Sequence, residues 1–505
     1  MIKDKSYTSF NQVSGGRAAV LFLLFLIGIY SMYSSGIAGL GIVAMIPVMV
    51  IACYFIFKHE MLLFYVLMIV NYFLHFLARC GYLPLPMSIP NEMLELMLIF
   101  TALITFKEIK SECFFNVMTL ALGIWCLFCC LEIFNDQCGL GVQVGNWFTG
   151  IRLMAFQLVY PCIVMGIYIN TPKRLENLLL VFALLSVFSV LWALKQKNIG
   201  FTDSEKIFLI VAARTHMVNG VIRYFSVFSD AANYGIHMAS MAVVFILSCI
   251  STPLVRKRIF YGIVGALCVW GMFLSGTRTA IFCLLAGLGV YIFLSKSVKI
   301  AVPFTIVLLL FFCFMAFTTI GNGNPTIRRM RSAFNKDDAS LGVRNQNKAA
   351  LKKYMVDAPW GIGIGLEAQD VPAYSKFKVV SMIPPDSEYV YIWVRTGMVG
   401  ITVFVITTIM MFLGACWNVL FRINNKSLRG IGAGFTCAFI SLHLGGYANQ
   451  ILMQFPNVVI FYGGLALVYI FPYIDKEYTE WENKELEKQD KRKQLKLEKK
   501  RASRV

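Results

Sequence analysis

The chain contains 505 residues, of which 58% are hydrophobic and only 14% are charged, and its formal net charge is +19 at pH 7. Soluble domains carry about 25% charged residues, so this composition excludes a water-soluble fold. Apolar runs close to the roughly 20 residues that cross a bilayer recur along the sequence, separated by short polar stretches. Because lipid offers the backbone no hydrogen-bond partners, these runs are expected to be helices.

The apolar runs predict an all-α fold, namely a polytopic transmembrane helical bundle of about 12–14 spans. The range reflects three short runs, at residues 93–106, 236–250 and 280–294. In chain order, the predicted spans are residues 18–33, 37–57, 61–77, 93–106, 114–134, 153–169, 178–194, 236–250, 259–274, 280–294, 300–320, 397–420, 430–444 and 458–471.

Lysine and arginine residues lie in every second connector between these spans, which is the pattern of cytoplasmic loops. Both ends of the chain are therefore predicted to be cytoplasmic. The predicted parts are a cytoplasmic leader (residues 1–17), transmembrane helices 1–11 (18–320), a long, partly helical extracytoplasmic loop (321–396), transmembrane helices 12–14 (397–473) and a charged cytoplasmic tail (474–505). We interpret the tail as a solvated helix that touches anionic lipid head groups.

Arg278 lies in the short outer connector SGTRT at residues 275–279, so its guanidinium has to lie at the membrane surface or in a cavity. An isolated charge there is costly unless it is paired. Arg278 could snorkel to outer head groups or pair with an acid from another loop. We favour a third interpretation, binding of phosphate, because the planar guanidinium can donate two parallel hydrogen bonds to it.

Two further arginines lie in predicted outer segments. Arg223 precedes the span at residues 236–250, where it could meet a ligand at the bilayer boundary or form a salt bridge with Asp230. Arg344 lies in a stretch that resembles an amphipathic helix, with Ser340 as a possible N-cap. The glycine-rich segment that follows, residues 359–365, permits tight turns, but its context excludes a dinucleotide-binding loop.

Asp386 lies at the predicted membrane boundary, just before a group of aromatic residues. A carboxylate in this position is a candidate general base, and we assign that role to Asp386. The alternative is an ordinary acid beside an aromatic belt. His216, His237 and His443 also lie near the predicted outer face, and we interpret them as structural residues.

In this order and spacing, the segments resemble the O-antigen ligase and O-antigen polymerase family of bacterial integral membrane glycosyltransferases. The resemblance covers roughly residues 223–400. It rests on five elements: the entry segment at residues 223–235, the turn that ends at Arg278, the stretch at residues 340–344, the glycine segment at residues 359–365, and the polar and aromatic motif before residues 397–400.

The resemblance implies glycan transfer from an undecaprenyl-diphosphate carrier at the outer leaflet of the bacterial inner membrane, without a metal or another cofactor. The acceptor is the lipid A core in ligases and another carrier-linked glycan in polymerases. Arg223 and Arg278 would bind the diphosphate, assisted by Arg344. Membrane lipids and other polysaccharide assembly proteins are the further partners expected, and no nucleic acid is. The family often has His-Asn where this chain has Asp386 and Ser387, so Asp386 could replace the histidine, or the acceptor could be activated differently.

Two other functions fit a chain with this many spans. One is a flippase or transporter of lipid-linked oligosaccharides, although transporters typically show internal repeats and ionisable residues at mid-membrane. The other is a noncatalytic membrane subunit of a polysaccharide assembly machine. The absence of a visible repeat and the outer position of the charges favour the transferase.

Overall fold

The computed structural model describes residues 58–81, 88–104, 113–211, 216–218, 221–323, 325–331 and 339–502. The predicted leader and the predicted spans at residues 18–33 and 37–57 lie outside these described residues. The chain divides into two compact units, Met1–Leu63 and Phe64–Val505. The description below concerns the second unit, apart from the first turn of α2.

Nine helical stretches in the described residues are long and apolar enough to cross a membrane. Five of them are single helices: α2 (Glu60–Arg79), α7 (Pro172–Asn198), α10 (Ala231–Ser251), α11 (Val255–Leu274) and α18 (Lys426–Ala448). Three more are a helix with an adjoining turn: α4 (Val117–Leu131) with Glu132–Phe134, α17 (Glu388–Trp417) with Asn418–Arg422, and α19 (Gly463–Ala502) with the preceding turn Val458–Tyr462. The ninth is the continuous run of α5 (Val144–Ile151), the π-helical turn Arg152–Phe156 and α6 (Gln157–Tyr168).

Three more helices, α3 (Ser88–Ile104), α12 (Arg278–Leu294) and α13 (Val298–Phe317), coincide with the remaining predicted spans from residue 61 onward. The predicted all-α polytopic bundle is therefore confirmed. The described strands form a single small antiparallel hairpin of β1 (Met217–Val218) and β2 (Val221–Ile222), which follows the short helix α8 (Asp203–Val211).

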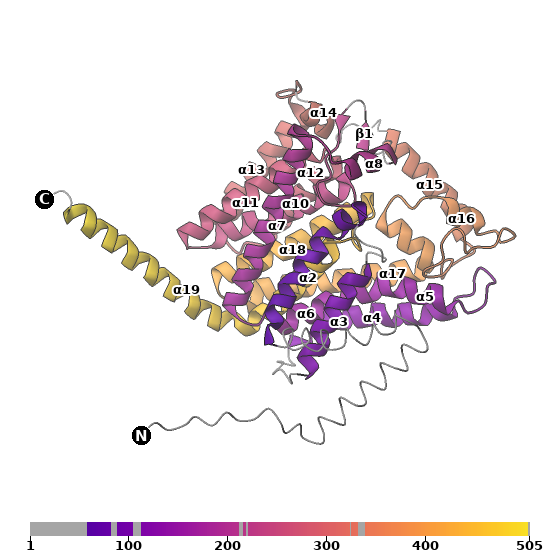
Figure 1. Cartoon of the computed structure of the whole chain (residues 1–505), viewed down its shortest axis with the longest axis horizontal. Coiled ribbons are helices and arrows are strands. Elements are labelled where there is room, and N and C mark those ends of the chain that lie inside the picture. Colours follow the sequence, from indigo (N-terminus) through magenta and orange to yellow (C-terminus); the bar gives the residue numbers. More distant parts are fainter. Residues whose placement is uncertain are drawn as a thin grey trace, which may run out of the picture. The chain divides into compact units, whose positions relative to one another are not determined.

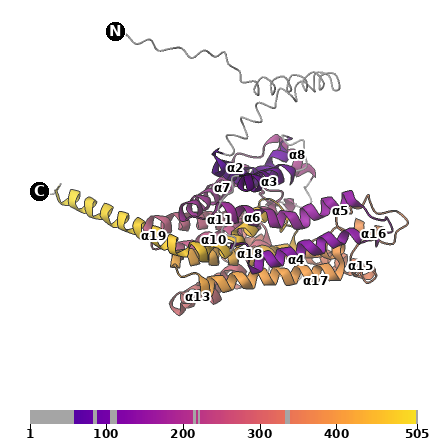
Figure 2. The ribbon, with the colours of Figure 1, turned by 90° about the horizontal axis from the view of Figure 1, so that it is seen from below.

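Helices α10 and α18 form the centre of the bundle, as Figures 1 and 2 show. In their most apolar segments, 83% and 78% of the residues are buried, compared with 33% in α17. The two central helices pack closely because glycines line their contact: a Cβ atom on Gly434 would lie 3.1 Å from the backbone of Val244. Ser441 of α18 donates a hydrogen bond to the carbonyl of Cys283 in α12 (2.7 Å), which fixes a third helix to this centre.

The long segment between α13 and α17 folds into the helices α14 (Pro325–Arg331), α15 (Ala339–Met355) and α16 (Lys378–Met382). A small apolar core, which includes Leu351, Ile362 and Phe377, holds α15 and α16 against the start of α17. Figures 1 and 2 show α15 and α16 beside the neighbouring ends of α5 and α17. The position of this subdomain outside the cell stays a prediction.

Helix α17 begins at Glu388, nine residues before the span predicted at residues 397–420, and its backbone breaks at Gly397 (φ 67°). The first two turns carry the charged residues Glu388 and Arg395, so hydropathy alone places the start of the helix too late. The amides of Ile362 and Gly363 donate to the carbonyls of Val394 and Arg395 (2.9 and 3.1 Å). The glycine-rich segment therefore satisfies carbonyl groups that the break at Gly397 leaves without helical partners.

Candidate functional site

The segment that carries Arg223 leads from the β1–β2 hairpin to the start of α10. The Arg223 amide donates to the carbonyl of His216 (2.9 Å), so the hairpin fixes the backbone at this position. Asp230 caps α10, and its carboxylate accepts hydrogen bonds from the amides of Ala232 (2.6 Å) and Asn233 (2.9 Å). Arg223 and the amino end of α10 are thus held in one rigid arrangement.

The turn between α11 and α12 meets the same region. The guanidinium of Arg223 donates to Thr277 Oγ1 (2.9 Å), and the Thr277 hydroxyl donates to the carbonyl of Ala231 (2.7 Å). Arg278 follows Thr277 as the first residue of α12. The short connector singled out in the sequence therefore packs directly against the entrance of α10.

Arg329 of α14 reaches this turn from the other side. Its Nε atom donates to the carbonyl of Gly276 (3.0 Å). Gly276 adopts φ 58°, and a Cβ atom there would lie 3.5 Å from the side chain of Arg329 and 3.6 Å from that of Arg223. The glycine thus allows a tight turn between two guanidinium side chains.

Four arginines, Arg223, Arg278, Arg329 and Arg344, form what we call the arginine cluster. Burial and the neighbouring charge of Arg329 lower the pKa of Arg223 to about 10, and Arg278 and Arg344 act in the same direction. Asp230 opposes the shift. Because three further cations and one carboxylate act on Arg223, this region is suited to a ligand with several negative charges.

Arg344 also lines a pocket of about 200 Å³ that contains Asp386, and we call this pocket the carboxylate pocket. Asn347, one turn further along α15, donates its amide hydrogen to Asp386 Oδ2 (2.8 Å). Ser387 then caps α17 by accepting a hydrogen bond from the amide of Val390 (3.1 Å). Arg344 therefore connects the arginine cluster with the pocket of the predicted base.

The loop between α18 and the turn Val458–Tyr462 fixes the segment that carries Asp386. Gln450 Nε2 donates to the carbonyl of Pro385 (2.9 Å), and the amide of Leu452 donates to the buried carboxylate of Glu388 (2.9 Å). Both contacts flank Asp386 in sequence. They hold it at a defined position relative to α18.

The same loop fixes the amino end of α10. Ser229 donates to Gln454 Oε1 (2.6 Å), and Asn233 donates to the same oxygen (3.0 Å). Asn457 donates to Asn233 Oδ1 (2.6 Å). This loop thus contacts both the amino end of α10, beside the arginine cluster, and the segment that carries Asp386. The sequence did not single the loop out, because its side-chain amides resemble those of any polar connector.

The three histidines are all buried and held in place. His216 Nε2 accepts a hydrogen bond from the amide of Ala231 (3.3 Å). His237 lies within hydrogen-bond distance of Asn457 (2.9 Å), and His443 of Tyr389 (3.0 Å). These contacts agree with the structural role that the sequence predicts for them.

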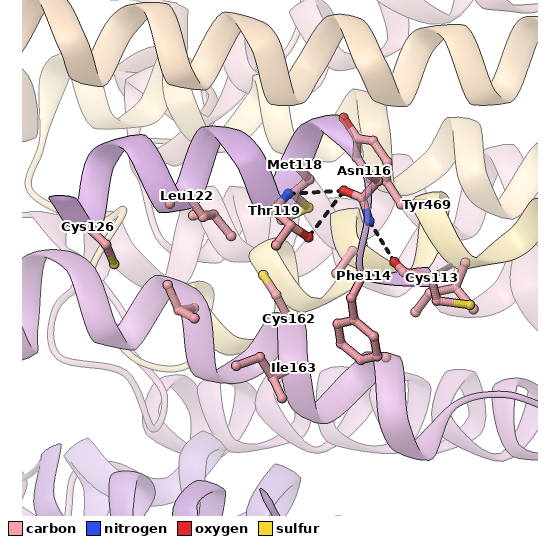
Figure 3. Close-up of a pocket in the computed structure, with 15 residues that line it drawn as sticks. Cys113, Phe114, Asn116, Met118, Thr119, Leu122, Cys126, Cys162, Ile163 and Tyr469 are labelled. Atoms are coloured by element: carbon pink, nitrogen blue, oxygen red, sulfur yellow. Dashed lines mark hydrogen bonds between the residues drawn. The ribbon is translucent and has the colours of Figure 1, made fainter. Parts of the chain in front are cut away.

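A further pocket lies elsewhere, between α4, α6 and α19 (Figure 3). Its volume is about 250 Å³ and its lining is mostly apolar. Asn116, one of its few polar groups, accepts a hydrogen bond from the Thr119 amide (3.1 Å) and donates to the carbonyl of Cys113 (2.7 Å). None of the described residues that line this pocket is charged, and neither the arginine cluster nor Asp386 is among them.

The fold and this site define a polytopic helical membrane protein with a cationic cluster where α10 and α12 begin. Residues 263–405 match the family model described as O-antigen ligase. Over this segment the chain is similar to that family, which confirms the resemblance inferred from the sequence. The matched segment contains Arg278, Arg329, Arg344 and Asp386, whereas Arg223 lies before it. Comparison with curated proteins gave no match.

The family match supports a glycosyl-transferring role in surface polysaccharide assembly. The structure brings Arg223, Arg278 and Arg344 into one cluster and places Asp386 in a pocket that Arg344 shares. Their roles as substrate-binding and catalytic residues remain predictions.

Proposed function

We propose that this protein is a membrane glycosyltransferase that acts on undecaprenyl-diphosphate-linked glycans at the outer leaflet, either as a ligase or as a polymerase of surface polysaccharide. The observation that carries the proposal is that the guanidinium groups of Arg223 and Arg329 both donate to the turn that precedes Arg278 (2.9 and 3.0 Å). A diphosphate carries several negative charges, and guanidinium groups bind phosphate oxygens through charge-assisted hydrogen bonds.

The chemistry follows from these positions. A hydroxyl oxygen of the acceptor attacks the anomeric carbon of the donor glycan, and the bond from that carbon to the diphosphate oxygen breaks. The bonding electrons move to the leaving oxygen, whose negative charge the arginine cluster stabilises. Asp386 accepts the hydroxyl proton, and the polyprenyl diphosphate leaves. The hydrogen bond from Asn347 to Asp386 Oδ2 (2.8 Å) supports this role, because it orients the carboxylate.

The decisive experiment compares cells that lack this protein and are complemented with wild type, Arg278→Ala or Arg329→Ala at equal membrane levels. Surface polysaccharide and carrier-linked glycans are both separated by size. We expect each substitution to lower transfer by about 100-fold or more, since each removes a stabilising charge. Arg328→Ala is the matched control, because Arg328 is an exposed neighbour of Arg329 on α14.

The same experiment separates the two acceptor classes. Single repeat units that accumulate on the carrier indicate a polymerase, whereas full-length carrier-linked chains that stay unattached indicate a ligase. Full activity of Arg278→Ala and Arg329→Ala contradicts the diphosphate site.

Asp386→Asn tests the base separately from the diphosphate site. The amide keeps the size of the side chain and its place beside Asn347, but it cannot accept the proton. Turnover is expected to fall by about 100-fold or more, while binding of the carrier-linked donor stays within a factor of about two. Unchanged turnover assigns acceptor activation to another group.

One observation favours the transporter as the second candidate. Glu92 and Glu95 of α3 and Arg152 of the α5–α6 run are ionisable residues within helices of the bundle, which hydropathy did not single out. Ionisable residues in such positions often mark transport pathways. A transporter mutant leaves the carrier-linked glycan in the inner leaflet, whereas a transferase mutant leaves it in the outer leaflet. Labelling of the glycan from the outer side of intact spheroplasts distinguishes the two.

A further inference from the structure

A second polar pocket lies at the opposite ends of α10 and α12 from Asp230 and Arg278, on the face that the sequence predicts to be cytoplasmic. Its volume is about 130 Å³. The carboxyl ends of α10 and α12 and the amino ends of α13 and α18 surround it. The pocket is far along these helices from the arginine cluster, so it is a separate site.

Three cationic side chains, Lys296, Lys426 and Arg429, line this pocket, which we call the basic pocket. Ser251 and Ser295 also line it, and their hydroxyl groups donate to the carbonyls of Leu247 (2.9 Å) and Ile292 (3.3 Å). None of the described residues that line the pocket carries a carboxylate. Three cations in one pocket supply the charge-assisted hydrogen-bond donors that phosphate oxygens bind.

The nearest carboxylates in contact with the start of α18 are already engaged on the side of α19. Asp475 accepts hydrogen bonds from the amides of Asn424 (3.1 Å) and Asn425 (2.9 Å), and Glu482 accepts one from Asn425 Nδ2 (2.8 Å). These carboxylates moderate the positive potential at the helix end. They do not line the pocket.

Helix geometry adds to the positive potential. Lys426 and Arg429 occupy the first turn of α18, where the helix dipole disfavours cations and favours an anion. Helix α13 begins beside them, and the side chain of its N-cap residue, Ser297, makes no capping hydrogen bond. Lys296 adopts φ 53°, a left-handed conformation that is unfavourable for lysine, at the turn between α12 and α13. A bound anion could accept hydrogen bonds from the uncapped amides at the start of α13.

We propose that the basic pocket binds the phosphate head group of an anionic phospholipid from the leaflet on this face. The apolar residues Leu294 and Ala433 also line the pocket, next to the polar groups. Val302 and Ile306 of α13 are exposed (51% each) on the helix that begins at the pocket, and they offer a surface for acyl chains. Basic pockets between membrane helices at the cytoplasmic face are known to bind anionic head groups. The proposal does not depend on the proposed transferase activity.

The test measures lipid binding to the purified, delipidated full-length protein by native mass spectrometry. Phosphatidylglycerol, phosphatidylcholine and inorganic phosphate are each titrated separately. We expect phosphatidylglycerol to bind and phosphatidylcholine to bind at least about tenfold more weakly. In Lys426→Gln/Arg429→Gln, the affinity for phosphatidylglycerol should fall by about fivefold for each removed charge.

Two controls keep the result interpretable. Lys299→Gln removes a charge from the first turn of α13 outside the pocket lining, and it should leave binding unchanged. Lys296→Asn removes one charge from the pocket lining at an exposed position. Because asparagine tolerates the left-handed backbone there, this variant remains testable if the double variant fails to fold. It should weaken binding by about fivefold.

Binding of phosphatidylglycerol that is equal in wild type, Lys296→Asn and the double variant overturns the proposal. Inorganic phosphate that displaces the lipid at low millimolar concentration, with the same dependence on Lys426 and Arg429, also overturns it by identifying a site for a soluble anion. The transferase assay plays no part in either outcome, so failure of one proposal leaves the other intact.

Discussion

The hydroxyl of Thr277 receives a hydrogen bond from the guanidinium of Arg223 at 2.9 Å and donates one to the carbonyl of Ala231 at 2.7 Å. Thr277 is buried, with 4% of its surface exposed. The Thr277 hydroxyl thus connects the turn before Arg278 with Arg223 and with the amino end of α10. Its position predicts that Thr277 orients the arginine cluster.

Thr277→Val keeps the shape of the side chain and removes both hydrogen bonds. We expect a loss of stability of about 2 kcal/mol, because the guanidinium and the carbonyl both lose a partner. Glycan transfer should fall by more than the stability loss explains, since Arg223 loses the hydrogen bond that orients it. The measurements are thermal unfolding in detergent and transfer activity at equal membrane levels.

Thr277→Ser retains the hydroxyl and should keep most of the activity. If Thr277→Val transfers glycan as well as wild type, Thr277 does not orient Arg223 for function.

The glycine segment supports a second prediction. Gly361 adopts φ 80°, and a Cβ atom there would lie 2.4 Å from the backbone of Arg395, next to the break of α17 at Gly397. Gly361→Ala should therefore cost about 3 kcal/mol through backbone strain and displacement of α17. Thermal unfolding of the purified protein measures this cost.

Gly342→Ala is the matched comparison, because Gly342 lies in α15 and a Cβ atom there meets nothing within 4 Å. This substitution should be neutral or stabilise the protein by up to about 1 kcal/mol. Equal unfolding temperatures for the two variants would show that the segment tolerates movement.

The positions of the membrane helices could be predicted from the sequence, because lipid imposes long apolar runs. The prediction failed at the start of α17, where Glu388 and Arg395 interrupt the apolar pattern. In the folded chain, the amide of Leu452 satisfies Glu388, and the ring of Tyr391 lies 5.4 Å from the Arg395 guanidinium. These contacts come from residues far apart in sequence or from the folded helix, so hydropathy does not report them.

The candidate site was predictable in part. Arg223, Arg278 and Arg344 could be singled out because arginine is unusual in predicted outer segments. Arg329 could not, since it lies beside Arg328 and Arg331 and all three look alike in sequence. The fold distinguishes them: Arg329 donates to the turn at Gly276, whereas Arg331 donates to the Thr318 carbonyl (2.6 Å) at the end of α13.

The dependence of stability on pH supports a third prediction, at Glu205 of α8. Burial raises the pKa of Glu205, but hydrogen bonds from the Thr202 amide (2.8 Å), Gln196 (2.7 Å) and Trp192 (2.9 Å) outweigh it and hold the pKa below its usual value. The ionised carboxylate therefore stabilises the fold. This contribution is fully present above pH 4.5, the usual pKa, and is lost as the pH falls through the lower pKa of the folded state.

Glu205→Gln should lower the stability by about 2 kcal/mol at pH 7, and the difference from wild type should shrink as the pH falls below 4.5. Thermal unfolding at several pH values measures this. Asp203→Asn is the control, because Asp203 lies on the same helix and is paired only with exposed Lys206. A difference between Glu205→Gln and wild type that does not change with pH would contradict the assignment.

The fourth prediction concerns the ion pair inside the bundle. Arg152 Nε lies 2.8 Å from Glu92 Oε2, with side chains that are 19% and 10% exposed. Arg152 also donates to Ser88 Oγ (2.7 Å), and Gln157 donates to Glu92 (3.3 Å). Removing one charge leaves the other without its partner, which costs more than removing both.

Arg152→Leu alone should therefore destabilise the protein by about 3 kcal/mol, whereas Glu92→Leu/Arg152→Leu should recover at least half of that loss. A double-mutant cycle from thermal unfolding in detergent measures the coupling. Glycan transfer by the double variant adds a functional result: a transferase that uses the arginine cluster should keep its activity, because neither residue belongs to that cluster. A stable double variant that accumulates carrier-linked glycan in the inner leaflet would instead identify the ion pair as part of a transport pathway.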